Sequence, residues 1–547
     1  MKQTLFVLLI ILFTGINSLS QTVTISGDVR ALKTNLPITG VKVSVKNNGS
    51  QQMDSVFTDA SGNWQYSVVT SAEDEQFNPY SFRVLQNYPN PFNPSTRIGF
   101  YIPRDGFVEV TVHSVYGELI DSRSGYLSAG NHSIDWYSRS SAGVYLYTIR
   151  FGEISYTKKM IQLDGGSGKG LSEFRAGVDY QPSAPFMKTI SGSLNLQIVF
   201  TKIPYAADTL DVSVNGGENF STLLETVHDK YTLVDLHNDI IEKMVNDPTY
   251  RLGTQHNFNH TDIPRMEYGD VDIQFFSLWV HPTTYTGNYY NQTIVMRDLL
   301  NSELAANPSR MRQAFTADQA VSISDSGKIA AVIGVEGGHS IENSLEKLAA
   351  LYHSGMRYMT ITWNNSTPWA ISAQDNRSQT QGLSDFGRQV IKAMDSLGIM
   401  IDVSHTGIKT IQDILSVTSN PIIATHSGAR TVRNHYRNLY DWQIIDIANS
   451  GGVIGVVFYP YFLNGTANAS VTDVIRHIDH IVSLVGVDHV AIGSDFDGIE
   501  VVPVGLEDVT KFPALTAALL EHGYTEHEVA KFLGLNFLRV FRQVCGE

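Results

Sequence analysis

The sequence predicts an α/β chain in which a (β/α)8 TIM-type barrel follows all-β, immunoglobulin-like sandwich modules. Two patterns support this prediction. Short runs that alternate apolar and polar residues, separated by turn clusters, occupy the first two hundred residues, and from about residue 232 strand-length apolar runs alternate with helix-length amphipathic stretches. The length of 547 residues fits several domains at roughly 100 to 200 residues each.

The composition describes a folded and acidic chain. Apolar residues make up 42% and charged residues 17%, which provides enough apolar surface for packed cores and excludes wholesale disorder. The 39 Lys and Arg against 54 Asp and Glu give a formal charge of -15, so phosphate backbones would be repelled and no nucleic-acid partner is expected. The single cysteine, Cys545, excludes an intrachain disulfide, so any metal must be held by His, Asp and Glu.

Residues 1–20 have the pattern of a secretory signal peptide. Lys2 precedes an apolar run at residues 5–13, and Ser18 and Ser20 supply the small residues of a cleavage site. The apolar run is shorter than the ~20 residues needed to cross a bilayer, and no other stretch is long and apolar enough to do so. The sequence therefore predicts an exported chain, secreted, periplasmic or on the cell surface, with no transmembrane segment in the mature protein.

Two predicted β-sandwiches follow the signal peptide. In residues 21–75 short alternating runs are separated by turn clusters, and the hairpin at 56–64 resembles the carboxypeptidase regulatory-like family of spacer modules. In residues 80–163, the Asn- and Pro-rich stretch 85–96 and the run 142–147 resemble the C-terminal sorting and hook-capping-like sandwiches of exported bacterial proteins. Because this module is internal, a sorting role and a plain spacer role both remain open.

Residues 164–224 are predicted to be a linker followed by a β segment of unassigned fold. The glycine-rich run 165–170 is similar to a phosphate-binding loop, but Gly170 stands where a hydroxyl would be needed to bind magnesium. This run is therefore interpreted as a flexible linker. Alternation at residues 193–200 indicates further β structure.

Residues 225–547 are predicted to form the barrel. Eight strand-length apolar runs in this region match the count and size of a TIM-type barrel, and a doubly wound open sheet is the alternative. The runs are residues 232–239, 271–280, 329–336, 358–363, 400–405, 421–426, 452–458 and 490–495.

Most of these runs end on a residue that can bind metal. Taken singly, each has an ordinary explanation as a packed histidine or a helix cap. A closed parallel barrel, however, brings the carboxyl ends of its strands together at one rim, where active sites form. The residues concerned are His237, Asp239, Glu336, His405, His426 and Asp495.

These side chains can hold a pair of metal ions. His237 and Asp239 are two residues apart and point to the same face of a strand, so one imidazole and one carboxylate can share a metal. His405 and His426 supply neutral nitrogens to a second metal, and Glu336 bridges the two with its two oxygens. This mixture of imidazole and carboxylate suits two zinc ions and leaves each a position for water.

The region from about residue 231 to 544 resembles the membrane (renal) dipeptidase family of metallopeptidases. The matching motifs are DLHND at 235–239, TDIPR at 261–265, GVEG at 334–337, TPWA at 367–370, GLSDFG at 382–387, IDVSH at 401–405, THS at 425–427, RN at 437–438, GSDFDG at 493–498 and GLED at 505–508. The resemblance implies a (β/α)8 barrel of the metal-dependent hydrolase type that holds two zinc ions. It implies the same metal ligands as the strand ends, places Asp495 beside the bridging solvent, and matches Arg437 to the arginine that binds the substrate's terminal carboxylate.

One position departs from the family pattern. Trp363 stands where better-known members carry a histidine that helps to hold the tetrahedral intermediate. Tryptophan donates one hydrogen bond but cannot become cationic. We therefore expect metal binding to persist and the substrate-binding pocket to change, with Asn364 or Asn365 as compensating amide donors.

The sequence thus predicts an exported dipeptidase that cleaves small dipeptides with a metal-bridging hydroxide. Asp495 would accept the proton of the nucleophile and pass it to the departing amine, while Arg437 would bind the carboxylate. An alternative is a metal-dependent amidohydrolase for another small amide, such as an N-acyl amino acid. An alternative of another class is a catalytically inert adhesion or scaffold protein. The sequence leaves open the preferred dipeptides, the tolerance of D-residues, attachment to the cell surface, and whether the chain is a monomer or a homodimer.

Overall fold

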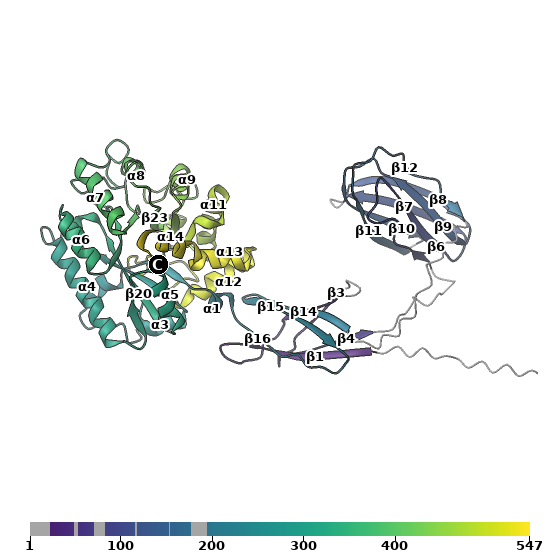
Figure 1. Cartoon of the computed structure of the whole chain (residues 1–547), viewed down its shortest axis with the longest axis horizontal. Helices are drawn as coiled ribbons and strands as arrows, with labels where there is room; N and C mark the ends of the chain where they lie inside the picture. The colour runs from purple at the N-terminus through teal and green to yellow at the C-terminus, as the bar shows by residue number, and fades with distance from the viewer. Residues whose placement is uncertain are drawn as a thin grey trace, which may run out of the picture. The chain divides into compact units, whose positions relative to one another are not determined.

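The computed structural model describes residues 22–48, 53–69, 82–114, 118–152, 154–176 and 194–546. The chain divides into two compact units, the first made mainly of residues 67–194 and the second of residues 25–66, 195–213 and 218–547. The elements of each unit can be followed by colour and label in Figure 1. The predicted signal peptide lies outside the described residues.

A small β-sandwich is built from strands that lie far apart in the sequence. They are β1 (Thr22–Ala31), β2 (Lys42–Asn47), β3 (Met53–Phe57), β4 (Asn63–Val69), β14 (Leu194–Lys202), β15 (Tyr205–Val214) and β16 (Thr222–Leu224). One sheet has the order β16-β1-β4 and the other β15-β14-β2-β3. The segment 194–224, which the sequence left without a fold, therefore belongs to the same sandwich as the first strands. Its pairing partners precede the second module, so local patterns could not reveal them.

The second sandwich is formed by β5 (Arg83–Val84), β6 (Ser95–Ile102), β7 (Gly106–Ser114), β8 (Leu119–Leu127), β9 (Gly130–Tyr137), β10 (Gly143–Phe151), β11 (Ile154–Gln162), β12 (Gly170–Leu171) and β13 (Arg175–Ala176). Its sheets have the orders β11-β10-β7-β8 and β12-β9-β6-β5, and β13 also pairs with β9. Gly166 N donates to Ser140 O at 3.0 Å and Gly168 N to Ser138 O at 2.8 Å. The glycine-rich run is thus hydrogen-bonded to this sandwich, which differs from its interpretation as a flexible linker.

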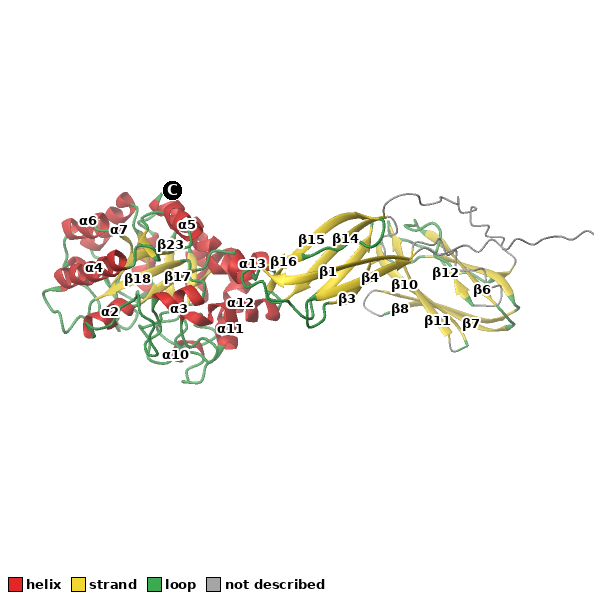
Figure 2. Ribbon diagram, turned by 90° about the horizontal axis from the view of Figure 1, so that it is seen from below, coloured by secondary structure: helices red, strands yellow, loops and turns green. Residues whose placement is uncertain are grey.

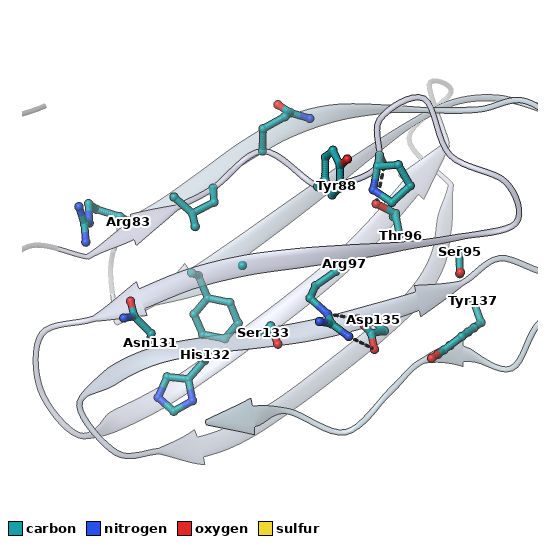
Figure 3. A pocket seen from close by; sticks show the side chains of 15 residues that line it. Arg83, Tyr88, Ser95, Thr96, Arg97, Asn131, His132, Ser133, Asp135 and Tyr137 are labelled. Carbon is teal, nitrogen blue, oxygen red and sulfur yellow. Dashed lines mark hydrogen bonds and ion pairs between the residues drawn. The ribbon is translucent and has the colours of Figure 1, made fainter. Parts of the chain in front are cut away.

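A cavity of about 550 Å³ lies over the outer face of the β12-β9-β6-β5 sheet. Arg97 and Asp135 are opposite each other on β6 and β9, and the guanidinium donates to both carboxylate oxygens at 2.6 and 3.2 Å. Figure 3 shows this pair in the groove, with Tyr88 and Tyr137 farther along it. The strand register places Arg97 opposite Asp135. The resulting ion pair supplies the hydrogen bonds that a buried carboxylate needs.

The C-terminal region is a closed barrel of parallel strands. They are β17 (Val234–Asn238), β18 (Ile273–Trp279), β20 (Ile329–Glu336), β21 (Met356–Thr360), β22 (Met400–Asp402), β23 (Ile422–Ser427), β24 (Val453–Val456) and β25 (Val490–Ile492), with β19 (Met311–Gln313) added beside β20. The order β18-β17-β25-β24-β23-β22-β21-β20 closes through pairing of β18 with β20. This closure confirms the predicted barrel and excludes the open sheet. Every predicted run contains one of the eight strands or most of it.

Helices surround the barrel, as the red ribbons around the yellow strands show in Figure 2. They are α1 (Val227–Lys230), α2 (Ile240–Asn246), α3 (Ile263–Tyr268), α4 (Tyr289–Ala306), α5 (Ala317–Asp325), α6 (Leu345–His353), α7 (Asp385–Leu397), α8 (Ile408–Leu415), α9 (Asp441–Asn449), α10 (Pro460–Leu463), α11 (Val471–Val485), α12 (Phe512–His522), α13 (Glu526–Ala530) and α14 (Asn536–Cys545). Local signals set their ends. In α7, the Ser384 side chain accepts from Gly387 N at the start, and Gly398 adopts φ 75° at the end.

Apolar side chains fill the amino end of the barrel. Phe537 and Phe541 of α14 pack edge-on against Phe275 of β18, with ring centroids 5.0 and 5.6 Å apart. The same core cluster contains the first residue of several strands, namely Val234, Ile273, Met400 and Val453. Since α14 covers this end, a polar site in the barrel is expected at the carboxyl end of the strands.

Candidate metal centre

The carboxyl ends of five strands bring the predicted ligands together. His237 lies in β17, Glu336 is the last residue of β20 and His426 lies in β23, whereas His405 and Asp495 follow β22 and β25 by three residues. Asp239 follows β17 directly, at the start of α2. All six side chains are buried. The structure therefore gathers every residue of the predicted set at one rim, as the barrel topology requires.

Glu336 lies between two groups of histidines. Its Oε1 is 2.8 Å from His405 Nε2 and 3.5 Å from His426 Nε2, and its Oε2 is 3.6 Å from His237 Nε2. The Nε2 atoms of His405 and His426 are 3.0 Å apart. One carboxylate thus presents a different oxygen to each side, which is the arrangement that a bridging ligand needs.

His237 also faces two aspartates. Its Nε2 is 3.4 Å from Asp239 Oδ2 and 4.0 Å from Asp495 Oδ1. Two sets of three side chains each offer ligand atoms that all lie within 4.8 Å of one another: His237, Glu336 and His426, and His237, Asp239 and Asp495. Each set could hold a cation, and the two sets share His237.

The backbone turns sharply where two of these side chains enter the site. His405 has φ 62° and Asp495 has φ 63°, in the left-handed region that costs a residue with a Cβ about 1 kcal/mol or more. Asp495 N donates to His237 O at 3.1 Å, which ties this turn to β17. Gly498 follows, and a Cβ there would lie 2.3 Å from Asp239 Oδ2. Only glycine lets the 495–498 turn approach the Asp239 carboxylate so closely.

A chain of hydrogen bonds fixes the orientation of His426. Asp402 is fully buried and accepts from Thr360 Oγ1 at 2.5 Å and from Thr425 Oγ1 at 2.7 Å. Because the Thr425 hydroxyl proton points to Asp402, its oxygen must accept the hydrogen bond from His426 Nδ1, 2.9 Å away. His426 Nε2 is then left without a proton and can act as a metal ligand.

Two further side chains orient the other histidines. Tyr358 OH lies 2.9 Å from His237 Nδ1, and Asn364 Oδ1 lies 2.9 Å from His405 Nδ1. Asn364 was predicted as a donor to the substrate, but its amide oxygen faces His405. Sequence reasoning did not identify Tyr358, Asp402 or Thr425 as part of the site. The signal for Asp402 was its place in the 401–405 motif, as an acid at the end of a buried strand.

The charges of the site depend on one another. Burial raises the pKa of Glu336, but the neighbouring His405 and His237 outweigh it and hold the pKa well below its usual value. Burial and the Arg437 guanidinium lower the pKa of His405 to about 4. Burial lowers the pKa of His237, yet the adjacent Asp239 and Glu336 carboxylates raise it well above its usual value. Carboxylates crowded into a buried site are an environment that favours a bound cation.

The residues present fit a metal centre. His237 Nε2 and Asp239 Oδ1 are buried and make no hydrogen bond within the part of the chain that the structure describes. Buried polar atoms without a partner are costly, so such atoms call for a ligand. Neutral imidazole nitrogens together with carboxylate oxygens are the donor set of zinc and similar divalent ions.

Arg437 and Trp363 lie beside this cluster. Arg437 is 3% exposed and donates from one terminal nitrogen to His426 O at 3.1 Å, while its Nε makes no hydrogen bond to any described residue. The Trp363 ring lies 6.1 Å from the His405 ring and 4.9 Å from the Trp279 ring. A cavity of about 160 Å³ has both His405 and Arg437 in its lining. The two residues predicted to contact substrate are thus next to the predicted metal ligands.

Comparison with known families covers the barrel and the second sandwich. The model of the membrane dipeptidase family, peptidase family M19, matches residues 222–546. The chain belongs to this family. The model of the secretion system C-terminal sorting domain matches residues 86–162, so the second sandwich is a sorting domain.

Solved dipeptidases share the barrel. One described as dipeptidase AC, a metallopeptidase of family M19, is 29% identical with a TM-score of 0.55, covering 58% of this chain and 99% of that one. A metallopeptidase from Rhodobacter sphaeroides, bound to a phosphinate mimic of the dipeptide L-Ala-D-Ala, is 28% identical with a TM-score of 0.54, covering 57% and 99%. A probable dipeptidase from Pseudomonas aeruginosa is 23% identical with a TM-score of 0.53, covering 58% and 96%, and shows the fold alone.

Membership of the membrane dipeptidase family supports a hydrolase of the metallopeptidase class. The family is metal-dependent, and the barrel of this chain presents His, Asp and Glu groups that could hold metal. The sorting domain suggests export or display at the cell surface. A search of the described residues finds no helix with the length and apolar character needed to span a membrane.

Proposed function

We propose that this chain is an exported dipeptidase that uses two zinc ions to hydrolyse the peptide bond of dipeptides. The position of Glu336 carries the proposal. Its two oxygens face different histidines, with Oε1 2.8 Å from His405 Nε2 and Oε2 3.6 Å from His237 Nε2. A carboxylate placed in this way is suited to bridge two cations.

The histidines and carboxylates divide into two ligand sets. His237 and Asp239 would hold one ion, His405 and His426 the other, and Glu336 would contact both. When bound, the ions would polarise the substrate carbonyl and lower the pKa of a water molecule. The hydrogen bonds to the Nδ1 atoms, such as that of Thr425 with His426, keep the Nε2 atoms free for this purpose.

Asp495 is the proton carrier in this proposal. Its Oδ1 lies 4.0 Å from His237 Nε2, and its left-handed backbone directs the carboxylate into the cluster. The carboxylate would take the proton that the attacking water loses and pass it to the nitrogen of the leaving amine. Both transfers happen at the same oxygen pair, so no second acid is required.

Arg437 sets the length of the substrate. Its buried guanidinium has a free Nε–H, and the planar fork of donors matches a carboxylate. His405 and Arg437 both line the cavity of about 160 Å³, so a carboxylate held by Arg437 would lie close to the metal ligands. This geometry favours dipeptides over longer peptides. The indole N–H of Trp363 would take the place of the family histidine as a donor.

A combined metal and activity assay tests the proposal. We expect purified protein to contain two zinc ions per chain and to hydrolyse L-Ala-L-Ala or L-Ala-D-Ala much faster than N-acetyl-L-alanine. Removal of metal with a chelator should abolish turnover, and added zinc should restore it.

The other outcomes of this assay select the rival functions. Faster cleavage of N-acetyl-L-alanine would indicate an amidohydrolase for acylated amino acids. Protein that holds no zinc and cleaves no amide would indicate an inert adhesion or scaffold protein. Full turnover in metal-free protein would rule out the proposed mechanism altogether.

A further inference from the structure

The cavity beside the metal centre carries an excess of positive charge. Its lining includes His405, Arg430, Tyr436, Arg437 and Tyr440, and among its fourteen lining residues there are two arginines and no carboxylate. The whole chain is acidic, with 54 Asp and Glu against 39 Lys and Arg. A cationic pocket in an acidic protein is a local feature that favours an anionic ligand.

Arg430 is held in place without being neutralised. Its guanidinium lies 4.3 Å from the centre of the Tyr440 ring, and its Nε donates to Asn434 Oδ1 at 2.9 Å. Its backbone N donates to Leu439 O at 2.7 Å. The structure gives its two terminal nitrogens no hydrogen bond to a described residue. Arg430 therefore presents a positioned fork of donors with a cationic charge.

The arginines of the loop that follows β23 differ from most other arginines of the barrel. None of Arg430, Arg433 and Arg437 forms an ion pair with any residue that the structure describes, although most arginines in the barrel do. Burial and then these three arginines lower the pKa of His435 to about 4, which indicates that their charges reach the same place. Cationic groups left without partners at a site are available to a ligand.

From these contacts we infer that Arg430 binds a second carboxylate of the substrate, the side-chain carboxylate of an Asp or Glu residue at the carboxyl terminus. This inference rests on the proposed function. Arg437 would hold the terminal carboxylate, and Arg430 lines the same cavity, so the side chain next to that carboxylate is the part of the substrate that can reach it. The predicted substrate class is therefore acidic dipeptides.

Matched pairs of substrates test this inference. L-Ala-L-Asp is compared with L-Ala-L-Asn, and L-Ala-L-Glu with L-Ala-L-Gln, because each pair differs in charge and hardly in size. The corresponding L,D-dipeptides are included. We expect kcat/KM to favour the acidic member of at least one pair by about tenfold, mainly through KM, as a charge-assisted pair predicts.

Variants then assign the preference to one residue. Arg430→Gln should lower kcat/KM for the acidic substrate to the value for its amide partner. It should leave kcat/KM for the amide substrate and the zinc content nearly unchanged. Arg430→Lys should keep part of the preference, since it keeps the charge. Arg433→Gln is the control, because Arg433 lies on the same loop without lining the cavity, and it should keep the full preference.

Three results would each overturn the inference. One is equal kcat/KM for the acidic and amide members of both pairs in the unaltered protein. Another is an Arg430→Gln variant that slows both members equally. The third is an Arg433→Gln variant that removes the preference. If instead no dipeptide in the panel is hydrolysed by zinc-loaded protein, the proposed function fails and this inference fails with it.

Discussion

Two groups of buried histidines in the barrel, those at the carboxyl rim and His477 of α11, differ in what their ring nitrogens contact. At the carboxyl rim, His405 Nε2 and His426 Nε2 face each other at 3.0 Å, and His237 Nε2 has no hydrogen bond among the described residues. On α11, His477 is also fully buried, but its Nε2 lies 2.9 Å from Leu463 O and its Nδ1 accepts from Ala429 N at 2.9 Å. Both groups are buried, but of the two only the rim histidines keep ring nitrogens that no backbone group occupies.

This difference separates a functional histidine from a structural one. A histidine whose two nitrogens are both used by backbone groups stabilises a loop, here the segment that follows β23. A histidine with Nδ1 held by a side chain and Nε2 directed at a carboxylate is prepared for metal. The hydrogen bonds of His477 therefore assign it a structural role.

The largest effect is expected from removing a rim histidine. His405→Ala should lower kcat by at least ~1000-fold and reduce the zinc content, because it removes a proposed ligand while the barrel stays folded. His353→Ala is the matched control, since His353 is an exposed histidine at the end of α6. Metal analysis, circular dichroism and dipeptide turnover are measured on both variants. Unchanged zinc and turnover in His405→Ala would contradict the proposed ligand set.

The buried histidine of α11 should instead contribute to the pH dependence of folding stability. Burial lowers the pKa of His477 to about 4. In the unfolded chain the pKa is near 6.5, so the unfolded state binds more protons between these values and stability falls as pH drops from 6.5 towards 4. The contribution is fully present above pH 6.5 and amounts to at most about 3 kcal/mol.

Denaturant unfolding of the full chain at pH 7.5 and pH 5 measures this effect. His477→Gln keeps an amide donor and an acceptor but does not titrate, so the fall in stability between the two pH values should become smaller. The zinc content of the variant should match that of the unaltered protein. An equal fall in both proteins would show that His477 does not contribute to the pH dependence.

A smaller effect is expected from the support of a rim histidine. Thr425→Val keeps the shape of the side chain but removes the hydroxyl between Asp402 and His426, so His426 loses the partner that fixes its protonated nitrogen. Zinc affinity should fall by roughly 10- to 100-fold. Thr425→Ser restores the hydroxyl and should restore affinity. Competition with a chromogenic chelator measures the zinc affinity of both variants. Equal affinity in the valine and serine variants would show that the Thr425 hydroxyl does not support zinc binding.

The sequence predicted those features that follow from local periodicity. Apolar runs and amphipathic stretches identified the eight strands, and the spacing of two between His237 and Asp239 placed both on one face. The hydrogen bond between Tyr358 and His237 was out of reach, because it joins strands that are not neighbours in the sequence and depends on the barrel being closed. The membership of β14 in the first sandwich was missed for the same reason, since its partner β2 lies before the sorting domain. The role proposed for Arg430 could not be predicted from the sequence, because it depends on the lack of a carboxylate partner among the residues that the structure describes.

The smallest effect is expected at Trp363, where the rim departs from the family pattern. Its indole N–H makes no hydrogen bond to a described residue, and its ring packs 4.9 Å from Trp279, so the donor is free to face a substrate oxygen. Trp363→Phe keeps an aromatic ring but removes the donor. It should lower kcat about two- to tenfold, which corresponds to the loss of one neutral hydrogen bond, and leave the zinc content unchanged. Trp363→His supplies a donor again and should recover the lost turnover. If the phenylalanine variant is as fast as the unaltered protein, the indole acts only as an apolar wall, and the rim would then stabilise the reacting oxygen through its metal ligands alone.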